Sequence, residues 1–369
     1  MTEATLPALP LPAGMRSRHV DGVNGLRMHL LEAGDPGRPC LLLLHGFPEL
    51  AYSWRKLMPP LAAAGYHVLA PDQRGYGRSS GFGTGYDADL LPFGMHNLVR
   101  DAVALLDVLG IDRAAAVVGH DFGAPVAAWC ALMHPERFAS VMLMSAPFGG
   151  PPAAAAGADI HAALAALPRP RKHYQHHYGT REANADMWHA PQGVHHFLRA
   201  YYHMKSADWA ANQPYELQGW RADELAKMPE YYVMDLGKGM AETVAPHLPT
   251  AAQVAGCTWL TDAELAVYAA EYARTGFQGG LQWYRCSTHP ACVAELQRFA
   301  GRCIDVPACY VAGASDWGMY QKPGELRRMR AACTQLRGVH RVPGAGHWVQ
   351  QEQPAATLRL LQDFLAEAA

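Results

Sequence analysis

Short apolar runs that break at glycine or proline recur along the first part of the chain, up to about residue 148. Runs that are apolar at every position, such as CLLLLHGF, are typical of strands buried on both faces of a sheet. The segments predicted to be strands are 26–34, 40–47, 66–77, 114–118 and 139–147. Apolar positions at helical spacing predict helices over 96–110 and 122–134, after a proline-rich lead-in that ends near residue 20. Strands that alternate with helices favour a mostly parallel sheet flanked by helices.

This alternation stops near Gly149 and returns after Gln297. The segment between them is rich in Ala, His, Met and aromatic residues, with helical stretches and without a convincing strand ladder. The elements predicted beyond it are strands at 306–314 and 338–342 and helices at 323–334 and 354–367. We therefore expect one α/β domain made of residues 1–148 and 298–369, with an α-helical cap inserted at 149–297. The low-complexity stretch GGPPAAAAGA at the start of the cap is the expected hinge.

Composition indicates a folded protein whose partners are small molecules. Half of the 369 residues are apolar, and the net charge of −2 comes without a basic stripe or an acidic tail, which argues against nucleic acid as a partner. The N-terminus lacks the features of a signal peptide, and no segment has the roughly 18 uninterrupted apolar residues that span a membrane. The eight cysteines form no CxxC pair, which favours a reducing compartment, and we predict a cytoplasmic monomer or homodimer.

An aspartate stands where a predicted buried strand turns into a helix. Asp121 lies in the stretch GHDFG, the pattern of a nucleophile elbow, in which glycines let neighbouring backbone approach a tight turn. Such a turn points its side chain into a cleft above the carboxyl ends of the strands, at a helix N-terminus that stabilises an anion. The local sequence leaves a second interpretation open, in which the aspartate only caps the helix.

Two distant residues favour the nucleophile. Asp316 follows the predicted strand 306–314, and His347 lies in the glycine-rich loop after the next strand. Nucleophile, acid and histidine appear in this chain order in the triads of α/β hydrolases, whose members sit on loops at one edge of the sheet. We predict that Asp121, Asp316 and His347 form a catalytic triad.

Several motifs, taken together and in this order, resemble the α/β-hydrolase superfamily and, within it, the epoxide hydrolases. They are HGFPE (45–49), YSWR (52–55), APDQRGYGRS (70–79), GHDFGAP (119–125), GFQGGLQWYR (276–285) and GAGHW (344–348). The resemblance implies the α/β-hydrolase fold with an inserted α-helical cap.

A carboxylate nucleophile points to substitution at a saturated carbon. Attack by Asp121 leaves an ester that water activated by His347 hydrolyses, whereas a serine would leave an ether. The leaving group is an epoxide oxygen or a halide. Similar haloalkane dehalogenases usually place Trp after the nucleophile, and fluoroacetate dehalogenases place arginines there, while this chain has Phe122 and no arginine. We predict an epoxide hydrolase that converts a hydrophobic epoxide and water to a vicinal diol. The alternatives are a haloalkane or haloacid dehalogenase and a non-catalytic hydrolase-like binding protein.

An epoxide oxygen leaves as an alkoxide and needs O–H donors. By resemblance, Tyr284 in LQWYR matches the ring-opening tyrosine, with Gln282 where Asn is commoner, and Tyr174 in HYQHHY matches its partner, followed by Gln175. Both tyrosines could instead be packing residues, and other cap tyrosines compete with them. These are Tyr178, Tyr201, Tyr202, Tyr231 and Tyr232.

The HGFPE segment is where this superfamily builds half of its oxyanion hole, so the backbone N–H groups of Phe47 and Phe122 are expected to stabilise a tetrahedral intermediate. The residues predicted to line or support the substrate pocket are His45, Pro48, Glu49, Trp54, Gln175, Trp317 and Trp348. Core packing is the alternative for the tryptophans. The histidine-rich stretches HYQHHY and GVHHF lack ligands at a recurring spacing, and no phosphate-binding glycine loop is present, so we predict no metal and no cofactor.

Overall fold

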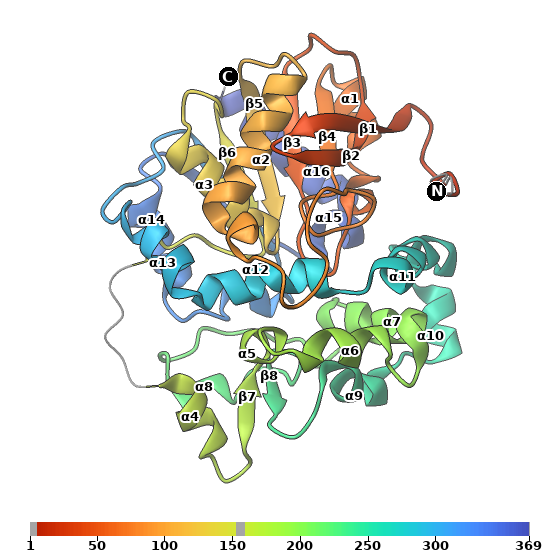
Figure 1. Cartoon of the computed structure of the whole chain (residues 1–369), viewed down its shortest axis with the longest axis vertical. Helices are drawn as coiled ribbons and strands as arrows, with labels where there is room; N and C mark the ends of the chain where they lie inside the picture. Colours follow the sequence, from red (N-terminus) through yellow and green to blue (C-terminus); the bar gives the residue numbers. More distant parts are fainter. Residues whose placement is uncertain (1–5, 153–158, 369) are drawn as a thin grey trace.

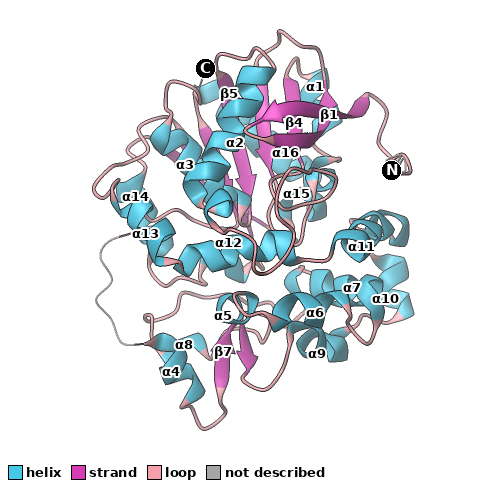
Figure 2. Ribbon diagram, in the orientation of Figure 1, coloured by secondary structure: helices cyan, strands magenta, loops and turns pink. Residues whose placement is uncertain are grey.

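The computed structural model describes residues 6–152 and 159–368, and its α/β core is built on one large sheet (Figure 1 and Figure 2). The sheet has eight strands in the order β1-β2-β4-β3-β5-β6-β9-β10. The strands are β1 Met15–Val23, β2 Leu26–Ala33, β3 Cys40–Leu44, β4 His67–Pro71, β5 Ala114–His120, β6 Val141–Met144, β9 Ala308–Gly313 and β10 Leu336–Val342. The pairs β1/β2 and β2/β4 are antiparallel, and the remaining pairs are parallel. This confirms the predicted mostly parallel α/β sheet.

The N-terminal segment differs from its prediction. The expected lead-in up to about residue 20 already enters β1 at Met15. This strand lies at the edge of the sheet, and of its residues only Val20 and Val23 are buried. An edge strand with mostly solvated side chains lacks the apolar run of a central strand, so the hydrophobic pattern did not reveal it.

Helices cover both faces of the sheet. Those of the core are α1 Met58–Ala63, α2 Met95–Val108, α3 Gly123–Met133, α14 Glu325–Ala332, α15 Val349–Glu352 and α16 Pro354–Ala368, with 3-10 turns η1 Ala51–Trp54, η2 Leu91–Phe93 and η4 Trp317–Met319. In β3, Leu42 and Leu44 enter the apolar cluster beneath α2 and α3, whereas Leu41 and Leu43 enter the cluster beneath α1 and α16. Successive strand side chains point to opposite faces, so a continuous apolar run is buried on both.

The segment between β6 and β9 forms an insertion that lies along one side of the core (Figure 1). Its elements are α4 Ile160–Ala165, β7 Arg171–His173, α5 Tyr174–Tyr178, α6 Glu182–Trp188, α7 Gly193–Lys205, α8 Ala222–Leu225, β8 Val233–Asp235, α9 Met240–Val244, η3 Ala245–His247, α10 Ala251–Gly256, α11 Asp262–Thr275, α12 Gln278–Thr288 and α13 Pro290–Gln297. β7 and β8 pair antiparallel, so the expectation of a cap without paired strands is wrong. Strands of three residues are too short to show a period.

Two helices near the end of the insertion connect it to the core. Helix α12 packs against α5 within the insertion, and α13 packs against α2 of the core. The predicted hinge begins in described residues, but its segment 153–158 lies outside them. Within the described part of the chain, no helix is both long and apolar enough to cross a lipid bilayer.

The loops that carry the predicted triad leave the sheet at one edge. Asp121 directly follows β5, Asp316 follows β9 and His347 follows β10. These strands run parallel, so their carboxyl ends meet at the same edge of the sheet, where α/β folds form their sites.

Candidate active site

Asp121 occupies a sharp turn between β5 and α3. Its φ angle is 51°, in the left-handed region that side chains other than glycine rarely adopt. Both flanking glycines are required by close approach: a Cβ on Gly119 would lie 2.1 Å from the carbonyl oxygen of Gly123, and one on Gly123 would lie 2.2 Å from that of Leu44. The turn is therefore held in a strained geometry by the tight contact of its neighbours.

The structure brings Asp121, Asp316 and His347 together. His347 Nε2 lies 3.1 Å from Asp121 Oδ2, and its Nδ1 lies 3.1 Å from Asp316 Oδ1. The structure does not support the alternative in which Asp121 caps α3, because the N-cap residue of this helix is Phe122 and the Asp121 side chain contacts His347. Instead, Asp121 Oδ1 accepts a hydrogen bond of 2.9 Å from the backbone N–H of Phe47.

Ser145 is a neighbour of the triad that sequence reasoning missed. Its Oγ lies 2.8 Å from His347 Nδ1, on the same side of the imidazole as Asp316. Ser145 follows β6 with a φ angle of 70°, and its carbonyl oxygen accepts a 2.6 Å hydrogen bond from the Tyr310 hydroxyl. A serine after an apolar strand is common, and nothing in the sequence signals this unusual backbone angle.

The backbone of His347 is fixed on both sides. Its N–H donates to the carbonyl oxygen of Lys205 at the end of α7, over 2.8 Å. Its carbonyl oxygen lies 2.7 Å from Nε2 of His120, whose Nδ1 lies 2.5 Å from Glu49 Oε2. Gln350 donates to the other oxygen of Glu49 over 2.9 Å. The loop that carries His347 is thus held by the insertion on one side and by a buried polar network on the other.

Charges around the triad keep both carboxyl groups ionised. Burial alone raises the pKa of Asp121, but the hydrogen bond and charge of His347, with the charges of Lys205 and His120, hold that pKa well below its usual range. Burial likewise opposes ionisation of Asp316, and His347 with smaller contributions from Ser145 lowers the pKa of that carboxyl. The two ionised carboxylates therefore lie on opposite sides of the His347 imidazole.

The backbone around the expected oxyanion hole is tightly packed. A Cβ on Gly46 would lie 2.4 Å from Asp121 Cβ and 2.7 Å from the backbone nitrogen of Phe122. Only glycine fits between these atoms. The N–H of Phe47 thereby reaches an oxygen of Asp121, as described above, while the backbone of Phe122 approaches the same loop.

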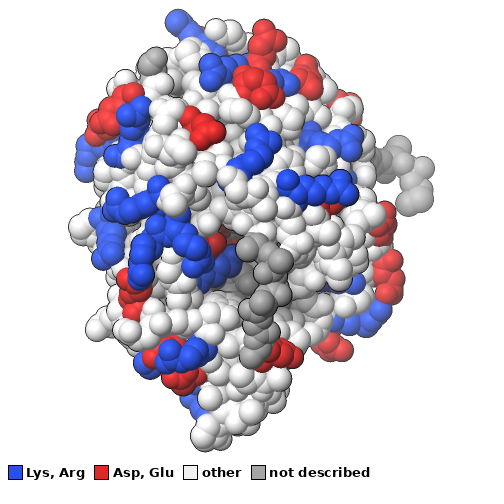
Figure 3. Space-filling model, turned by 90° about the vertical axis from the view of Figure 1, so that its left-hand side faces the viewer, with Lys and Arg blue, Asp and Glu red and all other residues white. Residues whose placement is uncertain are grey.

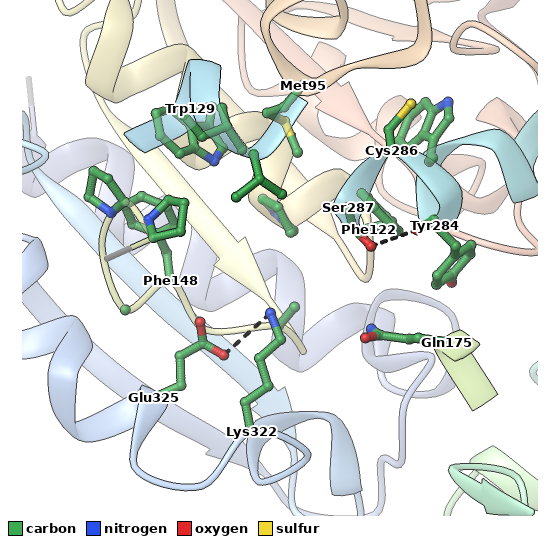
Figure 4. Close-up of a pocket in the computed structure, with 18 of the residues that line it drawn as sticks. Met95, Phe122, Trp129, Phe148, Gln175, Tyr284, Cys286, Ser287, Lys322 and Glu325 are labelled. Atoms are coloured by element: carbon green, nitrogen blue, oxygen red, sulfur yellow. Dashed lines mark hydrogen bonds and ion pairs between the residues drawn. The ribbon is translucent and has the colours of Figure 1, made fainter. Parts of the chain in front are cut away.

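A cavity of about 560 Å³ has Asp121 among its lining residues. Figure 4 shows part of its lining. Its lining includes Asp121, Phe122, Tyr174, Gln175, Trp283 and Tyr284. The other apolar residues of the lining include Phe93, Met95, Leu98, Trp129, Phe148, Cys286, Cys292, Val293 and Leu296. Figure 4 shows Tyr284 and Gln175 on one side, with Trp129 and Phe148 on the opposite side. The cavity is therefore shaped for a largely apolar molecule.

The cavity reaches the surface at a charged end. Lys322, Glu325 and Arg328 line this end, and Lys322 Nζ lies 3.8 Å from Glu325 Oε2. The space-filling view shows Lys and Arg side chains gathered beside a hollow on this face (Figure 3).

Tyr174 and Tyr284 both face the cavity, with ring centroids 5.9 Å apart. The Tyr174 hydroxyl donates to Gln321 over 3.1 Å and accepts from Gln175 Nε2 over 3.1 Å. Burial, and then the negative charge of Asp121, raises the pKa of both phenols well above the usual value. Both hydroxyls therefore stay protonated and can donate.

The competing tyrosines do not line this cavity. The Tyr202 hydroxyl donates to the carbonyl oxygen of Pro48 over 3.0 Å, and that of Tyr231 donates to Asn212 over 2.7 Å. Tyr178 donates to Tyr201 over a longer 3.4 Å. These hydrogen bonds lie within the insertion, except that of Tyr202, which joins the insertion to the core. The remaining competitor is Tyr232, whose buried hydroxyl has no hydrogen-bond partner among the described residues.

Of the residues predicted to form the pocket, Gln175 lines the cavity and the others do not. Those outside its lining are His45, Pro48, Glu49, Trp54, Trp317 and Trp348. Trp54 packs in the apolar cluster beneath α1 and α16, and Trp348 stacks on Tyr202 with centroids 4.2 Å apart. Glu49 belongs to the buried network below His347. The apolar lining comes instead from residues of η2, α2, α3, α12 and α13 and from Phe148 after β6, none of which was predicted to line the pocket.

No metal centre is evident among the described residues, because no group of at least three His, Cys, Asp or Glu side chains is arranged to hold one. In the histidine-rich α5, His177 Nε2 lies 3.1 Å from Asp186 Oδ2, and His173 accepts from the backbone of Gln175 as a helix cap. These contacts give both side chains a structural role.

Comparison with known proteins identifies the family of this chain. The family described as alpha/beta hydrolase fold matches residues 39–170. Epoxide hydrolase A of Mycobacterium tuberculosis is 34% identical over 364 residues, which cover 95% of this chain and 98% of the relative. The epoxide hydrolase of Caballeronia sordidicola is 30% identical, covering 93% of this chain and 91% of that protein.

Solved structures give the same result. The crystal structure of epoxide hydrolase A from Mycobacterium thermoresistibile matches with a TM-score of 0.73 at 33% identity, covering 95% of this chain and 98% of the other. Potato (Solanum tuberosum) epoxide hydrolase I matches with a TM-score of 0.74 at 29% identity, covering 96% and 99%. The chain thus belongs to the epoxide hydrolases of the α/β-hydrolase fold, a family of hydrolases that act on ether bonds.

Proposed function

We propose that this protein hydrolyses an epoxide to a vicinal diol through a covalent ester on Asp121. The observation that supports this most directly is one apolar cavity lined by an ionised carboxylate and by two protonated phenols, Asp121, Tyr174 and Tyr284. His347 stands 3.1 Å behind the carboxylate. A carboxylate can attack saturated carbon, and a phenol can protonate the departing oxygen.

In the first step, the carboxylate of Asp121 attacks a ring carbon from the side opposite its C–O bond. That bond breaks, its electron pair stays on oxygen, and the oxygen takes a proton from Tyr174 or Tyr284. The product is a hydroxyalkyl ester of Asp121 and a tyrosinate. The low pKa of Asp121 and the high pKa of the tyrosines give each group the protonation state that this step needs.

In the second step, His347 Nε2 takes a proton from water, which attacks the ester carbonyl. Asp316, 3.1 Å from Nδ1, stabilises the imidazolium. The N–H of Phe47, already 2.9 Å from Asp121 Oδ1, stabilises the oxyanion together with that of Phe122. The bond between acyl carbon and substrate oxygen then breaks, and His347 returns its proton to that oxygen. The proton of the regenerated carboxyl group restores the tyrosine, and the diol leaves.

The substrate we propose is a hydrophobic epoxide. Trp129 and Phe148 line the side of the cavity opposite Tyr284 and Gln175 (Figure 4), and these rings fit an aryl or alkyl substituent. The dehalogenase alternative has less support, because Phe122 carries no side-chain N–H for a halide. The indole of Trp283, which also lines the cavity, donates its N–H to the carbonyl oxygen of Arg74 over 2.9 Å.

The decisive experiment is a single turnover in ¹⁸O-labelled water with enzyme in excess of a styrene-type epoxide. The ester route puts an unlabelled oxygen of Asp121 into the diol and leaves the label in the protein. Direct attack by water puts the label into the diol and contradicts the proposal. A haloalkane of the same size serves as a control, since halide release without diol formation from epoxides would favour a dehalogenase.

Two variants separate the steps. In His347→Gln the ester cannot be hydrolysed, so intact-protein mass spectrometry should show a mass increase equal to the epoxide. Asp121→Asn should show no adduct and a turnover at least about 10⁴-fold lower. Normal turnover in either folded variant would refute the roles proposed for Asp121 and His347.

A further inference from the structure

A buried lysine lies beside the triad, and the mechanism above does not use it. Lys205 is the last residue of α7 and is only 2% exposed. A lysine at a helix end normally extends its ammonium group into water. In this protein Nζ lies 5.2 Å from the ring centroids of Tyr201 and Tyr232 and 5.4 Å from that of Trp348. The ammonium is thus held by three aromatic rings, an arrangement that suits a cation.

Two of these rings contact His347 and Tyr174, which lie on different sides of the site. Trp348 follows His347, and their ring centroids are 4.6 Å apart. Tyr232 packs against Tyr174 with centroids 5.2 Å apart. The backbone of Lys205 contributes as well, because its carbonyl oxygen accepts the N–H of His347. The lysine therefore occupies the wall between the catalytic histidine and the phenol cluster.

Lys205 differs from the other charges that face the triad. Among the described residues no carboxylate lies within ion-pair distance of its Nζ, whereas His120 is paired with Glu49. Its positive charge acts on Asp121, whose pKa it helps to lower. Glu352, the last residue of α15, accepts the backbone N–H groups of Gly346 and Trp348 over 2.8 and 2.9 Å and forms no contact with this ammonium within ion-pair distance.

We propose that Lys205 is a positioning residue whose fixed charge accelerates hydrolysis of the ester on Asp121. This proposal rests on the proposed function. Esterification removes the negative charge of Asp121, and the tetrahedral intermediate of the second step places a negative charge on the same side chain again. A cation that stabilises the carboxylate also stabilises this oxyanion, but it gives nothing to the neutral ester between them. The proton taken up by His347 is balanced by Asp316 on the other side of the ring.

The same charge has the opposite effect on the first step. It stabilises the carboxylate of Asp121, which is the reactant there, so it does not accelerate the attack on the epoxide. Loss of the charge should therefore slow the second step alone. A purely structural role would instead disturb both steps, because the rings around Lys205 touch both His347 and Tyr174.

The test is Lys205→Met, which keeps the length and apolar character of the side chain but removes the charge. Rapid-quench single turnovers with a styrene-type epoxide give the rates of ester formation and ester hydrolysis separately. We expect hydrolysis to slow by roughly tenfold, with ester formation unchanged or faster, so that the ester accumulates in the steady state. Lys205→Arg restores the charge and should recover much of the hydrolysis rate.

The matched control is Lys56→Met, which removes a half-buried ammonium that donates to the carbonyl oxygen of Trp259 over 2.7 Å, away from the triad. It should leave both rates unchanged. Equal slowing of both steps in Lys205→Met, or no change in either, would overturn the proposal. If Lys205→Met does not fold, the smaller neutral variant Lys205→Gln is judged by the same ratio of rates. Failure of the proposed function is seen separately, as wild-type protein that forms neither ester nor diol.

Discussion

The α/β core and the inserted segment hold their functional side chains by different means. In the core, Asp121 and Ser145 stand directly after strands with φ angles of 51° and 70°, so the backbone itself aims them. In the insertion, Tyr174 and Tyr284 lie in the helices α5 and α12 and are aimed by packing. The ring of Tyr284 lies 5.0 Å from that of Phe122, for example. Core residues are thus fixed by the fold, and cap residues by their neighbours.

This difference matches a division of the proposed chemistry. In the proposed mechanism the core supplies the nucleophile, the base and the backbone donors, which form and hydrolyse the ester. The insertion supplies the two phenols for ring opening, and also Lys205 of α7, which we propose acts on ester hydrolysis. Variants of the phenols and variants of the core residues that hold His347 should therefore affect different rates.

The largest change in rate that would test this division between core and insertion is expected from removing the phenol hydroxyls. Tyr174→Phe and Tyr284→Phe should each slow ester formation by about 10- to 100-fold, and the double variant by about 10³-fold or more, because no O–H is left to protonate the alkoxide. The rate of ester hydrolysis, measured in the same single turnovers, should remain close to that of the wild type.

Tyr178→Phe is the matched control, since this hydroxyl contacts Tyr201 and lies outside the cavity lining. It should change ester formation less than about threefold, the size expected for a weak neutral hydrogen bond. Equal losses in all three single variants would show that the tyrosines act through packing alone, and the proposed division would fail.

A smaller effect is expected from Ser145 in the core. Its Oγ contacts His347 Nδ1 beside Asp316, so Ser145→Ala should loosen the imidazole and slow ester hydrolysis by about 3- to 10-fold. Ester formation should be unaffected. Ser140→Ala provides the control, because its hydroxyl donates to the carbonyl oxygen of Ala115, one strand length away from the catalytic edge. Slower ester formation in Ser145→Ala would contradict the proposed division between the core and the insertion.

The last prediction is that the rate of ester formation stays constant over a wide range of pH. Ester formation needs ionised Asp121, whose pKa lies below the usual value, so this rate is lost only as the pH falls through that low pKa. It also needs protonated Tyr174 and Tyr284, whose pKa values lie well above the usual one, so it is lost only as the pH rises past them. Single-turnover ester formation should be flat between about pH 5 and 9. A rise or fall of this rate inside that pH range would mean that another group titrates in the first step.

The two regions also differ in how far the sequence could predict them. Asp121 and Asp316 follow strands that are largely apolar, His347 follows the more polar edge strand β10, and parallel strands bring their carboxyl ends to one edge. Their approach was therefore predictable without knowledge of side-chain packing. The elbow glycines gave a further signal because Gly119 and Gly123 leave no room for a Cβ.

The cavity wall was not predictable in this way. Trp54 and Trp348 were expected near the substrate because they stand beside motifs, yet both face apolar or aromatic packing, whereas Trp129 and Phe148 line the cavity. Aromatic residues suit a core and a pocket equally well, so their direction depends on tertiary contacts. Ser145 was not predicted for a related reason, because its position depends on a backbone angle that cannot be inferred from its residue type.

Two cysteines line the cavity at positions where an epoxide substrate could alkylate them. An epoxide alkylates thiolates readily, and Cys286 and Cys292 line the space that would receive it. Burial, and then the neighbouring sulfur or acidic groups, raises the pKa of both thiols, so they remain in the poorly nucleophilic protonated form. The carboxylate of Asp121, by contrast, is ionised, and in the proposed mechanism it forms an adduct that water can remove. On that mechanism the cavity directs alkylation to a reversible target and spares the two sulfur atoms, where the same reaction would be permanent.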